Sequence, residues 1–228
     1  MKKNKTVSPL ELSMARIISE NTPSEVVEAY RALYTNLMYI PIGSECKKLV
    51  ISSASHGEGK TVTAINLAYT VASTSKEARV LFIDANMRDR EASKLLSLVE
   101  GVEGLSDFLS GDAKAPTLSS SVYPNLDILP VGSPVSNVTA MLSSGRMADL
   151  FGYCNSNYDY VIIDTPSVNG YSDPVFFSNH ADGYILVCKA DKSDLHQVHD
   201  AVEALGKVDA RVLGFILTDA TLPKVANK

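Results

Sequence analysis

Six short apolar runs recur along this chain, and most of them are separated by stretches with helical spacing. The runs are rich in β-branched residues and nearly continuous in hydrophobicity, as strands covered by helices on both faces must be. They occupy residues 48–54, 79–85, 125–131, 160–166, 183–190 and 211–218. Strands that alternate with helices in this way predict an α/β fold with a doubly wound, mainly parallel sheet and helices on both faces. In such sheets, ligands bind beyond the carboxyl ends of the strands.

A helix is expected before the first strand, over residues 22–39. Thr22 is its expected N-cap, with Pro23 at the first helical position and Glu25 three residues after the cap. An apolar stripe follows at helical spacing, formed by Val26, Tyr30, Leu33 and Leu37. This stripe could pack on the domain itself or on a partner subunit, and the sequence leaves both open.

Length and composition narrow the function classes. Residues 1–20 carry no strong signal and are expected to form an N-terminal arm that could be mobile, whereas residues 21–228 are expected to form one domain. The net charge of −5 gives no reason to expect nucleic-acid binding. No run approaches the roughly 20 apolar residues that cross a bilayer. The three cysteines are scattered singly, so a cytoplasmic protein with reduced thiols is expected.

The stretch SASHGEGKTVTA, residues 53–64, has the features of a phosphate-binding loop that leads into a helix. Gly57 and Gly59 allow a tight turn, Lys60 can reach the β- and γ-phosphates, and the Thr61 hydroxyl can bind Mg²⁺. Ala54 stands where the usual pattern has its first glycine, which is the smallest departure available. A glycine-rich turn without a ligand is the less favoured alternative. The expected nucleotide-binding residues of the loop are Ser55, His56, Gly57, Glu58, Gly59, Lys60, Thr61 and Val62.

Two carboxylates end apolar runs of the predicted sheet. Asp84 ends the second run and Asp164 the fourth, so both are expected at the carboxyl edge with the loop. Magnesium is held in proteins by few carboxylates together with waters and phosphates. We therefore expect a metal site formed by Thr61, Asp84 and Asp164, although each aspartate alone could be a turn former. This assembly suits phosphoryl transfer.

The order of three segments resembles the bacterial tyrosine kinases of capsule and exopolysaccharide synthesis. GEGKT (57–61), LFIDANMR (81–88) and DYVIIDTPS (159–167) are similar to the Walker A, Walker A′ and Walker B segments of this P-loop NTPase family. EAYRALYTNL (28–37) resembles the family's Glu-x-x-Arg-x-x-Arg helix, which is associated with ring-like self-assembly. Further segments at 104–111, 127–137, 172–187 and 212–220 fall in family order, so the resemblance covers roughly residues 20–220.

The resemblance implies a role for each matching residue. Lys60 and Thr61 would bind MgATP, and Asp164 would act on the magnesium through water. Asp84 would be the catalytic carboxylate that orients or deprotonates a tyrosine hydroxyl, whose ordinary pKa is about 10. Arg88 would help to hold the phosphates or the acceptor.

The resemblance also implies partners and a location. Glu28 and Arg31 would act in assembly of a homo-oligomer, although they could equally form a local i,i+3 ion pair. The substrates would be protein tyrosines. A transmembrane polysaccharide co-polymerase would recruit the cytoplasmic kinase to the inner face of the membrane and activate it.

Several positions depart from the family pattern. Asn86 stands where the family has a second aspartate, and His56 where it has proline. Thr218 replaces the asparagine that contacts adenine, and Tyr34 replaces the last arginine of the assembly motif. Family members also end in a cluster of phosphorylated tyrosines, whereas no tyrosine follows Tyr184 here.

Two other functions stay open. The first is a nucleotide-switched regulatory ATPase or pseudokinase scaffold of the same family. This function would apply if Asn86 and the missing tyrosine cluster had abolished the kinase activity. A partition or division-site ATPase is the other alternative, but such proteins carry an extra lysine at the position of Ser55 and lack the leading helix. His196 and His199 could be drawn as a metal site with nearby aspartates, although such groups more often form the polar face of a surface helix.

Overall fold

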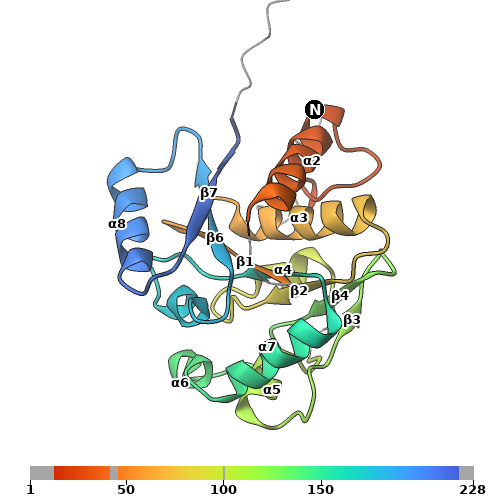
Figure 1. Cartoon of the computed structure of the whole chain (residues 1–228), viewed down its shortest axis with the longest axis vertical. Coiled ribbons are helices and arrows are strands. Elements are labelled where there is room, and N and C mark those ends of the chain that lie inside the picture. Colours follow the sequence, from red (N-terminus) through yellow and green to blue (C-terminus); the bar gives the residue numbers. More distant parts are fainter. Residues whose placement is uncertain (1–12, 42–45, 100, 221–228) are drawn as a thin grey trace, which may run out of the picture.

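The computed structural model describes residues 13–41, 46–99 and 101–220, which fold around one seven-stranded sheet (Figure 1). The strand order is β3-β4-β2-β5-β1-β6-β7. The strands are β1 (Lys47–Ser53), β2 (Val80–Asp84), β3 (Ser119–Ser120), β4 (Leu126–Leu129), β5 (Tyr160–Asp164), β6 (Gly183–Lys189) and β7 (Val212–Thr218). All neighbouring pairs are parallel except β3 and β4.

The six predicted strands and the mainly parallel doubly wound sheet are confirmed. Each predicted run overlaps one strand, with bounds that differ by a few residues at most. Strand β3 was not predicted, because a two-residue strand of serines has no apolar pattern. Its antiparallel pairing with β4 extends the sheet at the end opposite β7.

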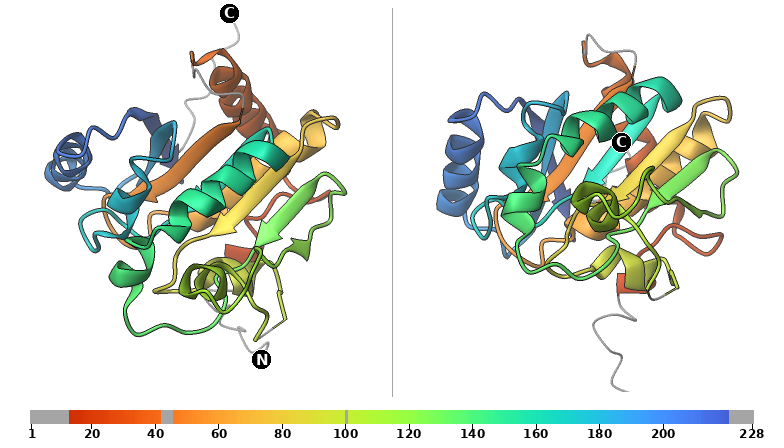
Figure 2. Two further views of the ribbon diagram at one scale, coloured as in Figure 1. Left: turned by 60° about the horizontal axis from the view of Figure 1, so that its bottom comes forward. Right: turned by 90° about the horizontal axis from the view of Figure 1, so that it is seen from below.

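Helices cover both faces of the sheet (Figures 1 and 2). The helices are α2 (Ser24–Tyr39), α3 (Lys60–Thr74), α4 (Glu91–Leu95), α5 (Leu105–Ser110), α6 (Val138–Leu142), α7 (Arg146–Asn157) and α8 (Leu195–Gly206), together with the 3-10 helix η1 (Asp173–Phe177). Alternate residues of the central strands enter two separate cores: Leu49 and Ile51 pack with α2, α3 and α4, whereas Val50 packs with α5, α7 and α8. The central strands are thus buried on both faces, as their continuous hydrophobicity predicts.

Helix α2 packs on α3 of its own chain. Leu37 of its stripe and Tyr34, which lies outside the stripe, are buried, and the Tyr34 ring meets Tyr160 edge-on with centroids 5.9 Å apart. The expected Thr22 cap is not formed; Pro23 occupies the cap position, and the Thr22 hydroxyl accepts a hydrogen bond from Ser19 N–H instead. The hydroxyl thus stabilises the turn before the helix and not the first helical turn.

Residues 13–20 of the expected arm lie against α3, while residues 1–12 are outside the described residues. Ile18 N–H donates to Asn66 Oδ1 at 2.8 Å, and Asn66 Nδ2 donates to the carbonyl of Arg16 at 2.9 Å. The Arg16 guanidinium pairs with Asp219, just after β7, at 3.2 Å. In the described part of the chain, no helix has the length and apolar character needed to cross a membrane.

Candidate active site

The loop between β1 and α3 adopts the turn that its glycines predict. Gly57 and Gly59 have φ angles of 74° and 93°, in the left-handed region that favours glycine. Ala54 is buried at the strand exit and does not have a positive φ. The backbone conformation therefore does not require the glycine that Ala54 replaces.

Glu58 holds the loop from within. Its buried carboxylate accepts hydrogen bonds from Ser55 N–H at 2.8 Å and from the Ser193 hydroxyl. The Thr218 hydroxyl, at the end of β7, donates to the Glu58 carbonyl at 2.9 Å. The Glu58 side chain is thus engaged in shaping the loop, a function that its place in the sequence motif did not reveal.

Lys60 and Thr61 form the first turn of α3, and both side chains are buried. The first turn of this 15-residue helix carries free backbone N–H groups and the positive end of the helix dipole, which attract anions. Within the described residues, the buried Thr61 hydroxyl has no hydrogen-bond partner. A buried hydroxyl without a partner is costly unless a ligand binds it.

Asp84 and Asp164 are neighbours across the paired strands β2 and β5, and both are fully buried. Asp84 accepts hydrogen bonds from Asn86 N–H and from the Ser93 hydroxyl, each at 3.2 Å. Neither carboxylate oxygen of Asp164 has a hydrogen-bond partner among the described residues. The structure brings the two predicted carboxylates together at the carboxyl edge.

Burial changes the acidity of both groups. Burial raises the pKa of Asp84 to about 6, and its hydrogen bonds with Ser93 and Asn86 act in the opposite direction. Burial also raises the pKa of Asp164 to about 8; the Lys60 ammonium opposes this rise, the nearby Asp84 adds to it, and the Thr61 hydroxyl, which is close but makes no hydrogen bond of good geometry, opposes it. Two buried acids of one site with raised pKa values are typical of functional sites.

The oxygen atoms at this edge fit a magnesium ion. Thr61 Oγ1 and both carboxylate oxygens of Asp164 are buried and without partners in the described structure, and all are hard oxygen donors. A cation bound here would satisfy these atoms and keep Asp164 ionised. Asp84, the third predicted ligand, already accepts two hydrogen bonds.

Asn86 and Asp89 stabilise the turn that follows β2. Asn86 Oδ1 accepts from Asp89 N–H at 3.3 Å, and Asn86 Nδ2 donates to Asp89 Oδ2 at 3.4 Å. Asp89 also lies 3.5 Å from the imidazole of His56. The fully buried Asn86 side chain therefore contributes to local structure through both of its polar atoms.

Arg88 binds a residue that the sequence did not link to it. Its guanidinium forms a bidentate pair with the fully buried Asp173, with both N···O distances at 2.8 Å. The guanidinium carbon lies 4.8 Å from the centre of the Tyr171 ring. Arg88 thus joins the turn after β2 to η1, and its expected contact with phosphate or acceptor stays a prediction.

Two predicted groups outside the loop have local partners. Glu28 and Arg31 form an exposed i,i+3 ion pair at 2.6 Å on α2. On α8, Asp194 caps the helix by accepting a hydrogen bond from His196 N–H, and among the described residues these two do not belong to a group with metal-ligand spacing. His199 has Asp200 and Glu203 within 4.8 Å, and all three are exposed.

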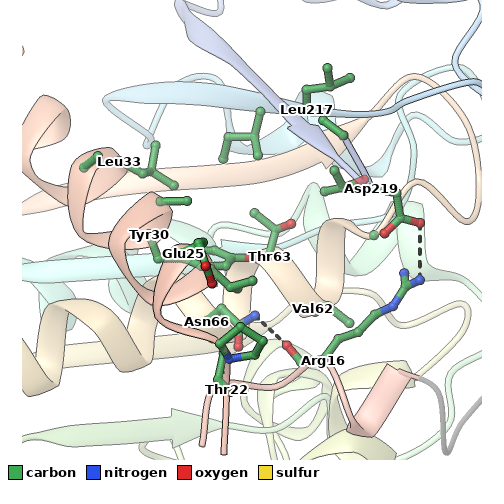
Figure 3. A pocket seen from close by; sticks show the side chains of 18 of the residues that line it. Arg16, Thr22, Glu25, Tyr30, Leu33, Val62, Thr63, Asn66, Leu217 and Asp219 are labelled. Atoms are coloured by element: carbon green, nitrogen blue, oxygen red, sulfur yellow. Dashed lines mark hydrogen bonds and ion pairs between the residues drawn. The ribbon is translucent and has the colours of Figure 1, made fainter. Parts of the chain in front are cut away.

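A cavity of about 660 Å³ adjoins the loop (Figure 3). It lies between α2, α3 and the end of β7, and its walls are mainly apolar. Gly59, Val62 and Thr218 line the side nearest the phosphate-binding loop. The Arg16–Asp219 pair lies at another part of its wall. The sequence motifs predict Thr218 and Val62 near a nucleotide, but they do not predict this cavity, which is built from distant segments.

The comparisons with known proteins agree with this geometry. The profile of the AAA domain family matches residues 46–213. Tyrosine-protein kinase YwqD of Bacillus subtilis is 34% identical over 86% of this chain and 82% of its own length. Tyrosine-protein kinase wzc of Salmonella typhimurium is 30% identical over 89% of this chain, but the match spans only 28% of that longer protein.

Solved structures give the same result. The kinase domain of Escherichia coli tyrosine kinase ETK superimposes with a TM-score of 0.81 at 25% identity, covering 100% of this chain and 88% of that one. A ParA family ATPase from Chlorobium tepidum reaches a TM-score of 0.63 at 20% identity, covering 77% and 75%, and shares the fold alone. The chain has the P-loop ATPase fold, and it belongs to the bacterial tyrosine-protein kinases of the capsule and exopolysaccharide type.

Proposed function

We propose that this chain is an ATP-dependent protein-tyrosine kinase that transfers the γ-phosphate of MgATP to tyrosine hydroxyls of proteins. The observation that carries the proposal is the pair of buried carboxylates, Asp84 and Asp164, on adjacent strands of the edge where Lys60 and Thr61 open α3. Membership of the tyrosine-kinase family supports the same reaction.

The nucleotide phosphates lie in the loop of residues 55–62, with Lys60 neutralising the β- and γ-phosphates. The adjoining cavity then receives the base and sugar, because it begins at Gly59 and Thr218 and has mainly apolar walls. The Thr218 hydroxyl already donates to the Glu58 carbonyl, so it helps to shape the loop beside the base.

Thr61 and Asp164 would hold magnesium, with Asp84 as a third group near it. When bound, the ion would supply positive charge against the phosphates during transfer. Lys60 contributes a second positive charge in a buried setting, where it acts more strongly than in water. Thr61, Lys60 and Asp164 thus position the phosphates for attack.

Asp84 acts as the catalytic carboxylate toward the tyrosine. With a pKa of about 6 it is mostly ionised near neutral pH, and it is a stronger base than an exposed aspartate. It orients the incoming hydroxyl and accepts its proton as the oxygen–phosphorus bond forms and ADP leaves. Arg88 supports the acceptor side by fixing the turn after β2 on Asp173.

A nucleotide-switched scaffold of the same family is the second candidate. Asn86 favours it, because its side chain cannot accept a proton and is engaged with Asp89. In that case, nucleotide would bind at the same loop without transfer to tyrosine. Asp84 keeps the base that the kinase reaction requires, so we place the kinase first.

The family membership also supports proposals on context. Residues 21–228 act as one kinase domain, and Glu28 and Arg31 contribute to a homo-oligomer. A transmembrane polysaccharide co-polymerase recruits the chain to the inner face of the cell membrane.

Phosphotransfer from labelled MgATP tests the proposed function, with phosphotyrosine and free phosphate measured separately on a tyrosine-rich peptide. We expect phosphotyrosine with the wild type and none with Lys60→Met. Phosphate release without phosphotyrosine would favour the scaffold, and so would bound nucleotide without either product.

A further inference from the structure

Lys192 reaches the phosphate-binding loop from the turn between β6 and α8. Its ammonium donates hydrogen bonds to the carbonyl oxygens of His56 at 2.8 Å and of Gly57 at 3.0 Å. These contacts join positions that are more than 130 residues apart in the chain. Neither the loop motif nor the predicted strands pointed to this lysine.

The two carbonyls that Lys192 binds determine the direction of two amides. In a planar trans peptide the N–H points opposite to the C=O. The His56 carbonyl shares its peptide plane with Gly57 N–H, and the Gly57 carbonyl shares its plane with Glu58 N–H. Because both carbonyls point to Lys192, both N–H groups are directed away from the lysine, toward the side on which we place the phosphates.

The sequence of the loop does little to restrict its backbone conformation. Residues 54–59 contain no proline and two glycines, so their backbone has more freedom to rotate than an average segment. The space beside Gly57 is filled by the lysine: a Cβ built there would lie 2.7 Å from Lys192 Nζ. The absence of a side chain at position 57 thus allows this approach.

The turn that carries Lys192 is itself fixed. Lys192 N–H and Ser193 N–H donate to the Lys189 carbonyl at 3.2 and 2.9 Å, and the Ser193 hydroxyl accepts from Lys189 N–H at 2.7 Å. The Ser193 hydroxyl donates in turn to the buried Glu58 carboxylate. Two neighbouring residues of one short turn therefore bind the loop: Lys192 binds its backbone carbonyls, and Ser193 binds the Glu58 side chain.

We propose that Lys192 is a positioning residue for nucleotide binding, which orients the Gly57 and Glu58 amides toward the phosphates before the nucleotide arrives. The inference rests on the proposed binding of ATP at this loop. Preorganised donors bind an anion more tightly because the loop need not be ordered on binding. Two charge-assisted hydrogen bonds are involved, so their removal affects binding measurably even though the lysine is exposed.

The test measures MgADP affinity by calorimetry for the wild type, Lys192→Met, Lys192→Arg and the control Lys76→Met, which replaces an exposed lysine after α3. Methionine retains most of the apolar stem but has no ammonium group. We expect the dissociation constant to rise about tenfold for Lys192→Met, to recover for Lys192→Arg and to stay unchanged for Lys76→Met. Equal affinity of the Lys192→Met variant and the wild type would overturn the inference and leave the proposed function intact.

Two further measurements separate positioning from other effects. In the nucleotide-free protein, the NMR signals of the Gly57 and Glu58 amides should shift in Lys192→Met. Unchanged signals would mean that the lysine acts only by contacting phosphate, and this result would overturn the inference. The melting temperature without nucleotide should stay near that of the wild type, while the increase caused by MgADP becomes smaller. A lower melting temperature with an unchanged increase would indicate a structural role and would also overturn it. If the wild type binds no nucleotide, the proposed function fails first.

Discussion

Asp84 and Asp164 stand side by side on the paired strands β2 and β5, and neither side chain is accessible to solvent. Asp84 has two hydrogen-bond donors, whereas the Asp164 carboxylate has none among the described residues. The two acids therefore differ in environment despite their equal burial. This difference is consistent with the proposed roles, in which Asp164 binds a cation and Asp84 accepts a proton from the tyrosine hydroxyl.

The metal-free protein should lose stability as the pH rises from about 5 to 8. Burial raises the native pKa of Asp164 to about 8 and that of Asp84 to about 6, well above their ordinary value of 3.8. Between these values the native state binds more protons than the unfolded chain, so the free energy of unfolding falls with increasing pH. Urea unfolding without magnesium or nucleotide measures this profile.

Asp164→Asn is the matched variant for the pH profile, because asparagine cannot ionise. It should flatten the fall, most clearly between pH 7 and 8. His180 acts in the opposite direction below pH 6.5, because burial lowers its pKa. A wild-type stability that rises between pH 7 and 8 would contradict the raised pKa of Asp164.

Asp84→Asn should abolish phosphotransfer while nucleotide binding persists. Loss of a general base typically lowers a rate by about 10²- to 10⁴-fold. Labelled MgATP with a tyrosine-rich peptide gives the rate, and calorimetry with MgADP gives the affinity. Asp149→Asn, at an exposed position in the first turn of α7, should change neither. A variant at position 84 with the wild-type rate would remove the aspartate from the mechanism.

Arg88→Met should destabilise the fold by about 2 kcal/mol. It leaves the buried Asp173 carboxylate without its bidentate partner, and breaking a buried pair costs about 3–5 kcal/mol, reduced here because Arg88 is partly exposed. Urea unfolding compares it with Arg31→Met, which breaks the exposed pair with Glu28 and should cost less than about 0.5 kcal/mol. Equal losses for the two variants would mean that the burial of Asp173 has no energetic effect.

Asn86→Asp should not increase phosphotransfer. The new carboxylate would face Asp89 Oδ2, which now accepts a hydrogen bond from Asn86 Nδ2, so the turn after β2 should become less stable by about 1 kcal/mol. Rates and urea unfolding check both expectations, and adding Asp89→Asn should recover the stability by removing the repulsion. A clear increase in rate would show that asparagine had disabled the site.

The sequence was sufficient for the parts of the fold that depend on local patterns. The central strands appear as continuous apolar runs because both faces are buried, and the loop appears because Gly57, Gly59, Lys60 and Thr61 are consecutive or nearly so. Asp84 and Asp164 could be placed together because each ends a strand of a parallel sheet.

Other parts of the site depend on contacts between distant segments. Glu58 with Ser193 joins residues 135 apart, and Arg88 with Asp173 joins residues 85 apart. A single sequence contains no local signal for such pairs, because each partner is an ordinary polar residue in a turn. The prediction that Thr22 caps α2 was wrong for a related reason. The Thr22 hydroxyl accepts a hydrogen bond from Ser19 N–H, which competes with the N–H groups of the helix.

The strand order has a consequence for synthesis. Strand β5 lies between β1 and β2, although it follows both in the chain. A growing polypeptide that ends before residue 160 has the loop and Asp84 but lacks the strand that joins β1 to β2. The site needs this non-local pairing, so a nascent chain on the ribosome brings the loop, Asp84 and Asp164 together only after β5 has emerged.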